Sequence, residues 1–149
     1  MHTKYHTLLG IALATITYIT TKNTPATIAT FIISWAPDTD HIIDYIIHEK
    51  TLKPNPTKLL TGQHYQDHKT IYIPLHAYEH TPLIYIITQT LLGTTTATTT
   101  TLAYLLHLIT DTITNPIHPQ TMLITWRAHK KFKSEHLCKN YQTTTINQK

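Results

Sequence analysis

Apolar, threonine-rich stretches of helical length alternate with breaks marked by proline or glycine along this chain. Within each stretch the apolar residues recur with the spacing of a helix, and prolines fall where helices should begin or end. The expected helices cover about 6–21, 25–35, 40–48, 75–92 and 101–114. The threonine run that follows Gly93 predicts a turn or a frayed helix start. We therefore expect an all-α fold, a small bundle of four to five helices.

At 149 residues the chain has the length of one domain. We expect a helical domain over 1–128, with a polar loop at about 50–72, followed by a basic tail over 129–149. The apolar N-terminal stretch resembles a signal peptide, but no small-x-small site ends it, so we interpret it as a retained helix. Cys138 is the only cysteine, which excludes an internal disulfide and a cysteine-based zinc motif.

Charged residues make up 13% of the chain, about half of the usual share. Low charge favours a bilayer or a deeply buried bundle. None of the apolar stretches reaches ~18 uninterrupted residues, but threonine hydroxyls can bond the preceding turn and so remain compatible with lipid. We therefore expect membrane-inserted or membrane-associated helices, with membrane lipid as a partner. The lysines near the end of the chain form a short cluster without interleaved arginines, which suits lipid headgroups at least as well as nucleic acid.

The densest polar cluster follows the expected break at Pro37. Asp38, Asp40, His41 and Asp44 lie within seven positions. Burying three carboxylates is costly unless a positive charge neutralises them, so the cluster indicates ligands of a metal ion. The alternative is that the acids cap a helix N-terminus, a role that explains one aspartate better than three.

A second cluster lies at the start of the expected helix over 75–92. His76 and His80 are four residues apart, and Glu79 is three residues after His76, so a helix would place them on neighbouring positions. The pattern differs from the His-Glu-x-x-His helix of zinc proteases because the glutamate is displaced. An exposed helix start is the alternative.

A third pair stands in the most apolar of the stretches. His107 and Asp111 are one helical turn apart and can supply two metal ligands, or one ligand and the group that orients it. A lone histidine on an apolar face is usually a core residue, but a paired aspartate favours the metal interpretation. His6 opens the first helix and could reach the same end of the bundle.

Arg127 is the only arginine and follows Trp126. Its planar guanidinium could hold the phosphate of a substrate. An interfacial Trp-Arg anchor is an equally good interpretation.

These elements resemble the predicted membrane-bound metal-dependent hydrolases, the YdjM-like inner-membrane proteins of prokaryotes. The resemblance runs from about His6 to Arg127 and depends on Pro-Asp-x-Asp-His at 37–41 and His-x-x-x-Asp at 107–111. Many members carry Gly-His-Arg-Gly-x-x-His-Ser in the middle of the chain. At that place this chain resembles a variant of the family that reads Leu-His-x-x-Glu. The same variant has a later His-x-x-x-Asp-x-x-x-Asn-Pro element, which here ends at Asn115 and Pro116. The resemblance implies a helical bundle, a divalent metal, hydrolase activity and a location in the inner or cell membrane.

The hypothesis from the sequence is a metal-dependent hydrolase that acts on a phosphoester through a metal-activated water. Zinc is the preferred ion, with manganese or iron as alternatives. The expected metal ligands are His6, Asp38, Asp40, His41, His76, Glu79, His107 and Asp111. Asp40 or Glu79 would act as the catalytic base, and Arg127 would bind the substrate. The alternatives are a bundle that transports protons or metal ions and a module in which a metal only staples helices.

Overall fold

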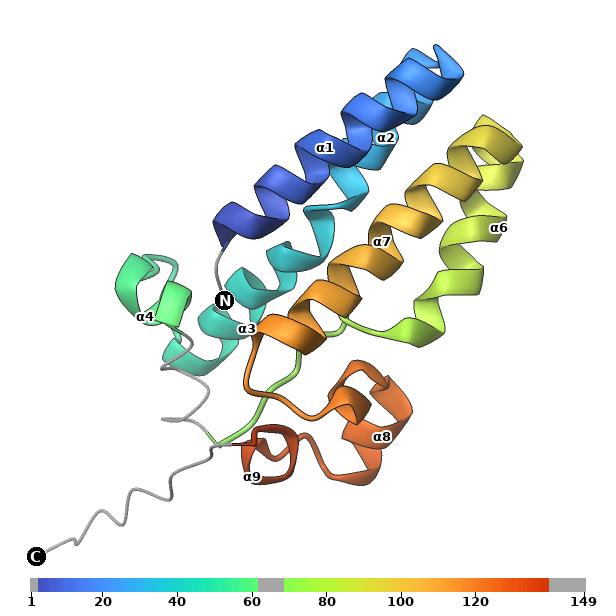
Figure 1. The fold of residues 1–149 in the computed structure, drawn as a ribbon. Helices are drawn as coiled ribbons and strands as arrows, with labels where there is room; N and C mark the ends of the chain where they lie inside the picture. The colour runs from blue at the N-terminus through green and yellow to red at the C-terminus, as the bar shows by residue number, and fades with distance from the viewer. Residues whose placement is uncertain (1–2, 62–68, 140–149) are drawn as a thin grey trace, which may run out of the picture.

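The computed structural model describes residues 3–61 and 69–139, and the regular structure within these ranges is helical (Figure 1). Two isolated β-bridges, Thr70 with Lys133 and Ile117 with Cys138, tie the loops together. The α-helices are α1 (Thr3–Thr21), α2 (Thr24–Ile33), α3 (Thr39–Glu49), α4 (Pro56–Thr61), α6 (Thr81–Leu92), α7 (Thr94–Thr114), α8 (Ile124–His129) and α9 (Ser134–Leu137). The short 3₁₀ turns are η1 (Ala36–Asp38), η2 (Tyr78–His80) and η3 (Pro119–Met122). The all-α prediction is confirmed.

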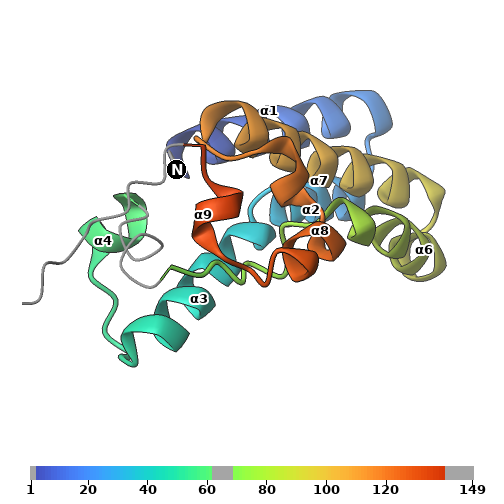
Figure 2. The same ribbon diagram turned by 90° about the horizontal axis from the view of Figure 1, so that it is seen from below.

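Two helical hairpins form the body of the fold. α1 packs against α2, α6 packs against α7, and α2 joins the hairpins by packing against α7. The first hairpin turns at Lys22, which has a left-handed φ of 52°, and Asn23 then caps α2 by accepting a hydrogen bond from the Ala26 N–H at 3.0 Å. The second hairpin turns at Gly93, whose φ of 84° suits glycine. Both turns lie at the same end of the molecule, whereas α3, α8 and α9 gather at the other end (Figures 1 and 2).

The threonine run after Gly93 is helical, contrary to the turn or frayed start expected there. α7 begins at Thr94, seven residues before the helix predicted from Thr101. The hydroxyls of Thr96, Thr98 and Thr100 each donate to the carbonyl four residues earlier, at 2.7–3.1 Å. These bonds satisfy the hydroxyls inside the helix, and packing against α6 supplies the stability that local propensity lacks.

The helix predicted over 75–92 begins only at Thr81. Pro82 lies in the first turn of α6, a position that suits proline, and Ala77 before η2 is extended, with φ of −143° and ψ of 126°. His76 therefore comes from irregular backbone, and the helical spacing expected for His76, Glu79 and His80 does not exist.

The prediction of membrane-inserted helices and of a membrane location is wrong. Among the helices that the structure describes, none is both long enough and apolar enough to cross a bilayer. α1 and α7 have 19 and 21 residues, but threonines and histidines interrupt their apolar residues. The low charge of the chain is reflected instead in exposed apolar side chains, among them Leu8, Ile16, Ile32, Leu91 and Ile113.

The C-terminal segment folds back onto the domain as far as Lys139. Leu137 of α9 is fully buried and packs with Ile71 and Ile73. The first half of the predicted tail thus contributes to a small core, while its residues 140–149 lie outside the described ranges. The predicted polar loop contains α4, and its residues 62–68 likewise lie outside them.

Candidate metal centre

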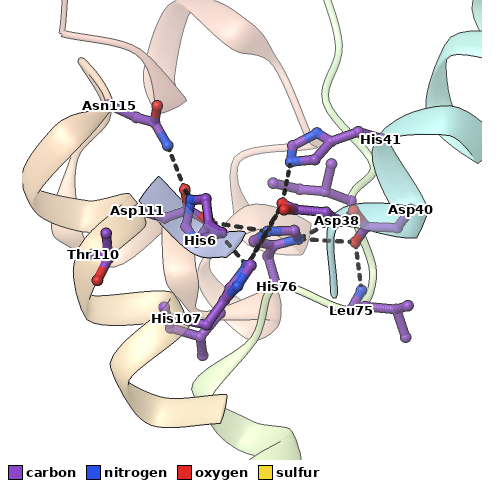
Figure 3. Close-up of polar contacts among 12 residues, drawn as sticks. His6, Asp38, Asp40, His41, Leu75, His76, His107, Thr110, Asp111 and Asn115 are labelled. Carbon is purple, nitrogen blue, oxygen red and sulfur yellow. Dashed lines mark hydrogen bonds and ion pairs between the residues drawn. The ribbon is translucent and has the colours of Figure 1, made fainter. Parts of the chain in front are cut away.

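Four buried side chains from three separate segments meet in the interior of the fold (Figure 3). Asp38 comes from η1, His76 from the extended segment before η2, and His107 and Asp111 from adjacent turns of α7. One potential ligand atom from each lies within 4.8 Å of the others. This group could hold a metal ion, as the clustering of acids and histidines in the sequence predicted.

Three of the four donor atoms are spaced as ligands of one ion are. Nε2 of His76 lies 3.2 Å from Nε2 of His107 and 3.0 Å from Oδ2 of Asp111. Nε2 of His107 lies 3.3 Å from the same carboxylate oxygen. Atoms ~2.0–2.1 Å from a tetrahedral zinc ion are roughly 3.3 Å apart, so these spacings fit a shared ion.

The partners of the two histidines determine which ring nitrogen carries the hydrogen. Nδ1 of His107 lies 2.8 Å from the carbonyl oxygen of Ser34, which can only accept, so Nδ1 donates. Nδ1 of His76 lies 3.1 Å from the Asp40 carboxylate and donates likewise. In the neutral rings both Nε2 atoms are therefore bare lone pairs, and these point at each other and at Asp111 (Figure 3). Such an arrangement needs a positive charge at its centre.

The Asp111 carboxylate is oriented by its other oxygen. Oδ1 accepts a hydrogen bond from the Asn115 amide at 2.7 Å and lies 3.1 Å from Nε2 of His6 (Figure 3). Oδ2 faces Nε2 of His76 at 3.0 Å and Nε2 of His107 at 3.3 Å. The structure thus places His6, a predicted ligand, behind Asp111.

The electrostatics of the cluster favour a bound cation. Burial lowers the pKa of His76, but hydrogen bonds to Asp111 and Asp40 more than offset this effect and raise the pKa to about 9. Burial acts to raise the pKa of Asp111, yet the hydrogen bonds of His107, His6 and His76 hold it well below its usual range. Burial raises the pKa of Asp38. Without a metal, His76 can therefore carry a second proton at the centre of the cluster, and a metal ion must displace this proton in order to bind.

The segment that carries His76 is held by side chains rather than by a helix. Arg127 is fully buried and donates from Nη1 to the Ile73 carbonyl at 2.6 Å and from Nη2 to the His76 carbonyl at 2.9 Å. The Tyr104 hydroxyl lies 2.7 Å from the carbonyls of both Leu75 and Ala77. These contacts fix the backbone on both sides of the imidazole, so the ring position does not depend on local secondary structure.

The remaining predicted residues have different surroundings. Asp40 is fully buried, and its Oδ2 accepts the Leu75 N–H at 2.8 Å as well as the Nδ1–H of His76 (Figure 3). His41 forms a second candidate metal group with Asp40 and His76. Glu79 accepts hydrogen bonds from the Thr125 N–H and hydroxyl and belongs to neither group.

Arg127 offers no exposed surface to a substrate, because its guanidinium is buried against backbone carbonyls. This role of Arg127 and the roles of Ser34 and Tyr104 were not predicted from the sequence. Tyr104 could have been found from its place on α7, since it lies three residues before His107 and so shares its face. A backbone carbonyl such as that of Ser34 leaves no signal in the sequence.

Comparisons of the chain with family models, curated proteins and solved structures found no match. The candidate metal centre therefore rests on the geometry and electrostatics of its own residues.

Proposed function

We propose that the protein is a metal-dependent hydrolase whose ion is held by Asp38, His76, His107 and Asp111. The observation that supports this proposal is that Nε2 of His76, Nε2 of His107 and Oδ2 of Asp111 lie within 3.0–3.3 Å of one another. A divalent cation would convert this repulsion of lone pairs into three attractive contacts, and the Asp38 carboxylate could supply a fourth. Imidazole and carboxylate donors suit zinc, manganese or iron.

A bound ion of this kind lowers the pKa of a coordinated water toward ~7 and polarises a phosphoryl oxygen. A phosphoester is the substrate class to test first. The resemblance of the Pro-Asp-x-Asp-His and His-x-x-x-Asp elements to the YdjM-like hydrolases supports a hydrolase in general and does not indicate the substrate. The roles of the residues behind the ligands follow from their contacts: Asp40 orients His76, and His6 and Asn115 orient Asp111.

A metal that only staples the fold is the second candidate. It is favoured by the burial of His76, His107 and Asp111, each at most 1% exposed. In this case the ion would join η1, the segment over 71–77 and α7, and protein atoms would fill every coordination position. Catalysis requires one position that water can enter.

The proposed function is tested by elemental analysis of the purified full chain, followed by assays with a panel of phosphomonoesters and phosphodiesters. We expect about one equivalent of metal in the wild type and in His129→Ala, which alters an exposed histidine, but little in His107→Ala. Turnover should vanish with a chelator and return with added metal. Equal metal in His107→Ala and the wild type would overturn the metal centre, and metal without turnover would favour the staple.

A further inference from the structure

The four donors of the metal centre are not held equally. His76 and His107 are each fixed through Nδ1, by the Asp40 carboxylate and the Ser34 carbonyl respectively. Asp111 is fixed through Oδ1 by Asn115 and His6. By contrast, neither oxygen of Asp38 has a hydrogen-bond donor among the described residues.

Asp38 is also the most distant and the most exposed of the four. Its Oδ1 lies 3.6 Å from Nε2 of His107 and 3.8 Å from Nε2 of His76, whereas the other three donors are 3.0–3.3 Å apart. Its exposed fraction is 7%, against at most 1% for the others. His41 also approaches this oxygen, with its Nε2 atom 3.9 Å from Oδ1 of Asp38.

The position of Asp38 in the chain gives its side chain freedom. It ends η1 and precedes α3, yet it makes no capping hydrogen bond to that helix. A carboxylate that caps a helix is anchored by backbone N–H groups, and that anchor is missing from this one. The rotation of the Asp38 side chain therefore breaks no hydrogen bond described for it.

We infer that Asp38 is the exchangeable ligand of the centre, the donor whose place an outside oxygen atom takes while His76, His107 and Asp111 remain in position. This inference rests on the proposed function and deepens it, because it identifies how a buried set of four donors admits water or a substrate oxygen. It also separates the roles of the two aspartates: Asp111 retains the ion, and Asp38 controls access to it. Asp40 is unsuited to be the exchangeable ligand because its Oδ2 already accepts hydrogen bonds from the Leu75 N–H and from Nδ1 of His76.

The test compares two isosteric substitutions, Asp38→Asn and Asp111→Asn, in the full chain. Each variant is titrated with Co²⁺, whose visible spectrum reports both binding and coordination, and inorganic phosphate is then added as a small oxygen ligand. We expect Asp38→Asn to bind Co²⁺ within about tenfold of the wild-type affinity and Asp111→Asn to bind it about 100-fold more weakly. The Co²⁺ spectrum of Asp38→Asn should respond to less phosphate than that of the wild type.

Thermal unfolding establishes that each variant is folded, and His107→Gln replaces Asp111→Asn if the latter does not fold. An equal loss of Co²⁺ affinity in the Asp38 and Asp111 variants would overturn the inference and leave the metal centre in place. So would a spectrum of Asp38→Asn that is no more sensitive to phosphate than the wild-type spectrum. If the wild type binds no Co²⁺, Zn²⁺ or Mn²⁺, the proposed function fails and this inference fails with it.

Discussion

The Nε2 atoms of His76 and His107 face each other at 3.2 Å, although each ring uses its Nδ1 hydrogen elsewhere. Only a proton or a metal ion between them makes this contact favourable. The competition between the two gives the centre a defined dependence on pH.

Metal affinity should rise with pH. In the ion-free protein the pKa of His76 is raised from 6.5 to about 9, so the stabilisation from its proton is fully present below pH 6.5 and is lost as the pH rises through about 9. A metal must displace that proton, and its apparent affinity should therefore increase about tenfold per pH unit from about pH 7 to about pH 9. Calorimetric titrations in buffers of different ionisation enthalpy would count the proton released. An affinity that is constant across this range would contradict the assignment of His76 as a ligand.

Arg127 should affect the metal affinity of the centre although it is not one of the ligands. Arg127→Met removes the donors to the Ile73 and His76 carbonyls, which we expect to lower the free energy of unfolding by roughly 1.5–3 kcal/mol. Metal affinity should fall about 10- to 100-fold, because the His76 backbone loses its support. Denaturant unfolding and metal titration measure the two effects. The control is Lys133→Met, which removes an exposed cation and should change neither the unfolding free energy nor the metal affinity. If Arg127→Met is destabilised but keeps full metal affinity, Arg127 supports the fold and not the metal centre.

Gly10 should be required for the close approach of α1 to α2. A Cβ at Gly10 would clash with Oγ of Ser34 and lie 3.3 Å from its Cβ. Gly10→Ala should therefore cost about 1–3 kcal/mol of unfolding free energy, and it should weaken metal binding because the Ser34 carbonyl holds His107. Denaturant unfolding measures the first effect and metal titration the second.

The paired variant Gly10→Ala with Ser34→Ala provides the control for this prediction. It removes the hydroxyl that the new methyl group would meet and should recover most of the lost stability. If the double variant is no more stable than Gly10→Ala alone, the contact with Ser34 is not the cause of the effect.

The metal cluster could be predicted from the sequence because acids are scarce in this chain and most lie beside histidines. The proline break after α2 and the helical spacing on α7 were enough to identify Asp38, His107 and Asp111 as candidates, whereas the packing of α2 against α7, which brings them together, is seen only in the structure. The position of His76 could not be derived in this way, since its segment is held by Asp40, Tyr104 and Arg127 from other elements. Such contacts override the helical spacing that the sequence shows around His76.

The membrane prediction failed for a different reason. Low charge and threonine-rich helices are compatible with a bilayer, but they are equally compatible with a bundle whose threonines bond their own helix. The hydroxyls of Thr110, Thr112 and Thr114 do so at 2.8 Å. Composition alone could not distinguish these two environments.

The two hairpin turns, between α1 and α2 and between α6 and α7, lie at one end of the molecule, away from the C-terminal half of α7 that carries His107 and Asp111 (Figure 1). The residues of the metal centre and the turns that connect the helices of each hairpin therefore lie in different parts of the protein. We call the part with the two turns the connecting end. A spectroscopic label, a short insertion or new chain termini could be engineered at the connecting end without altering a residue that touches the ligands. Reporters of helix motion could thus be attached there while the chemistry at the other end is measured undisturbed.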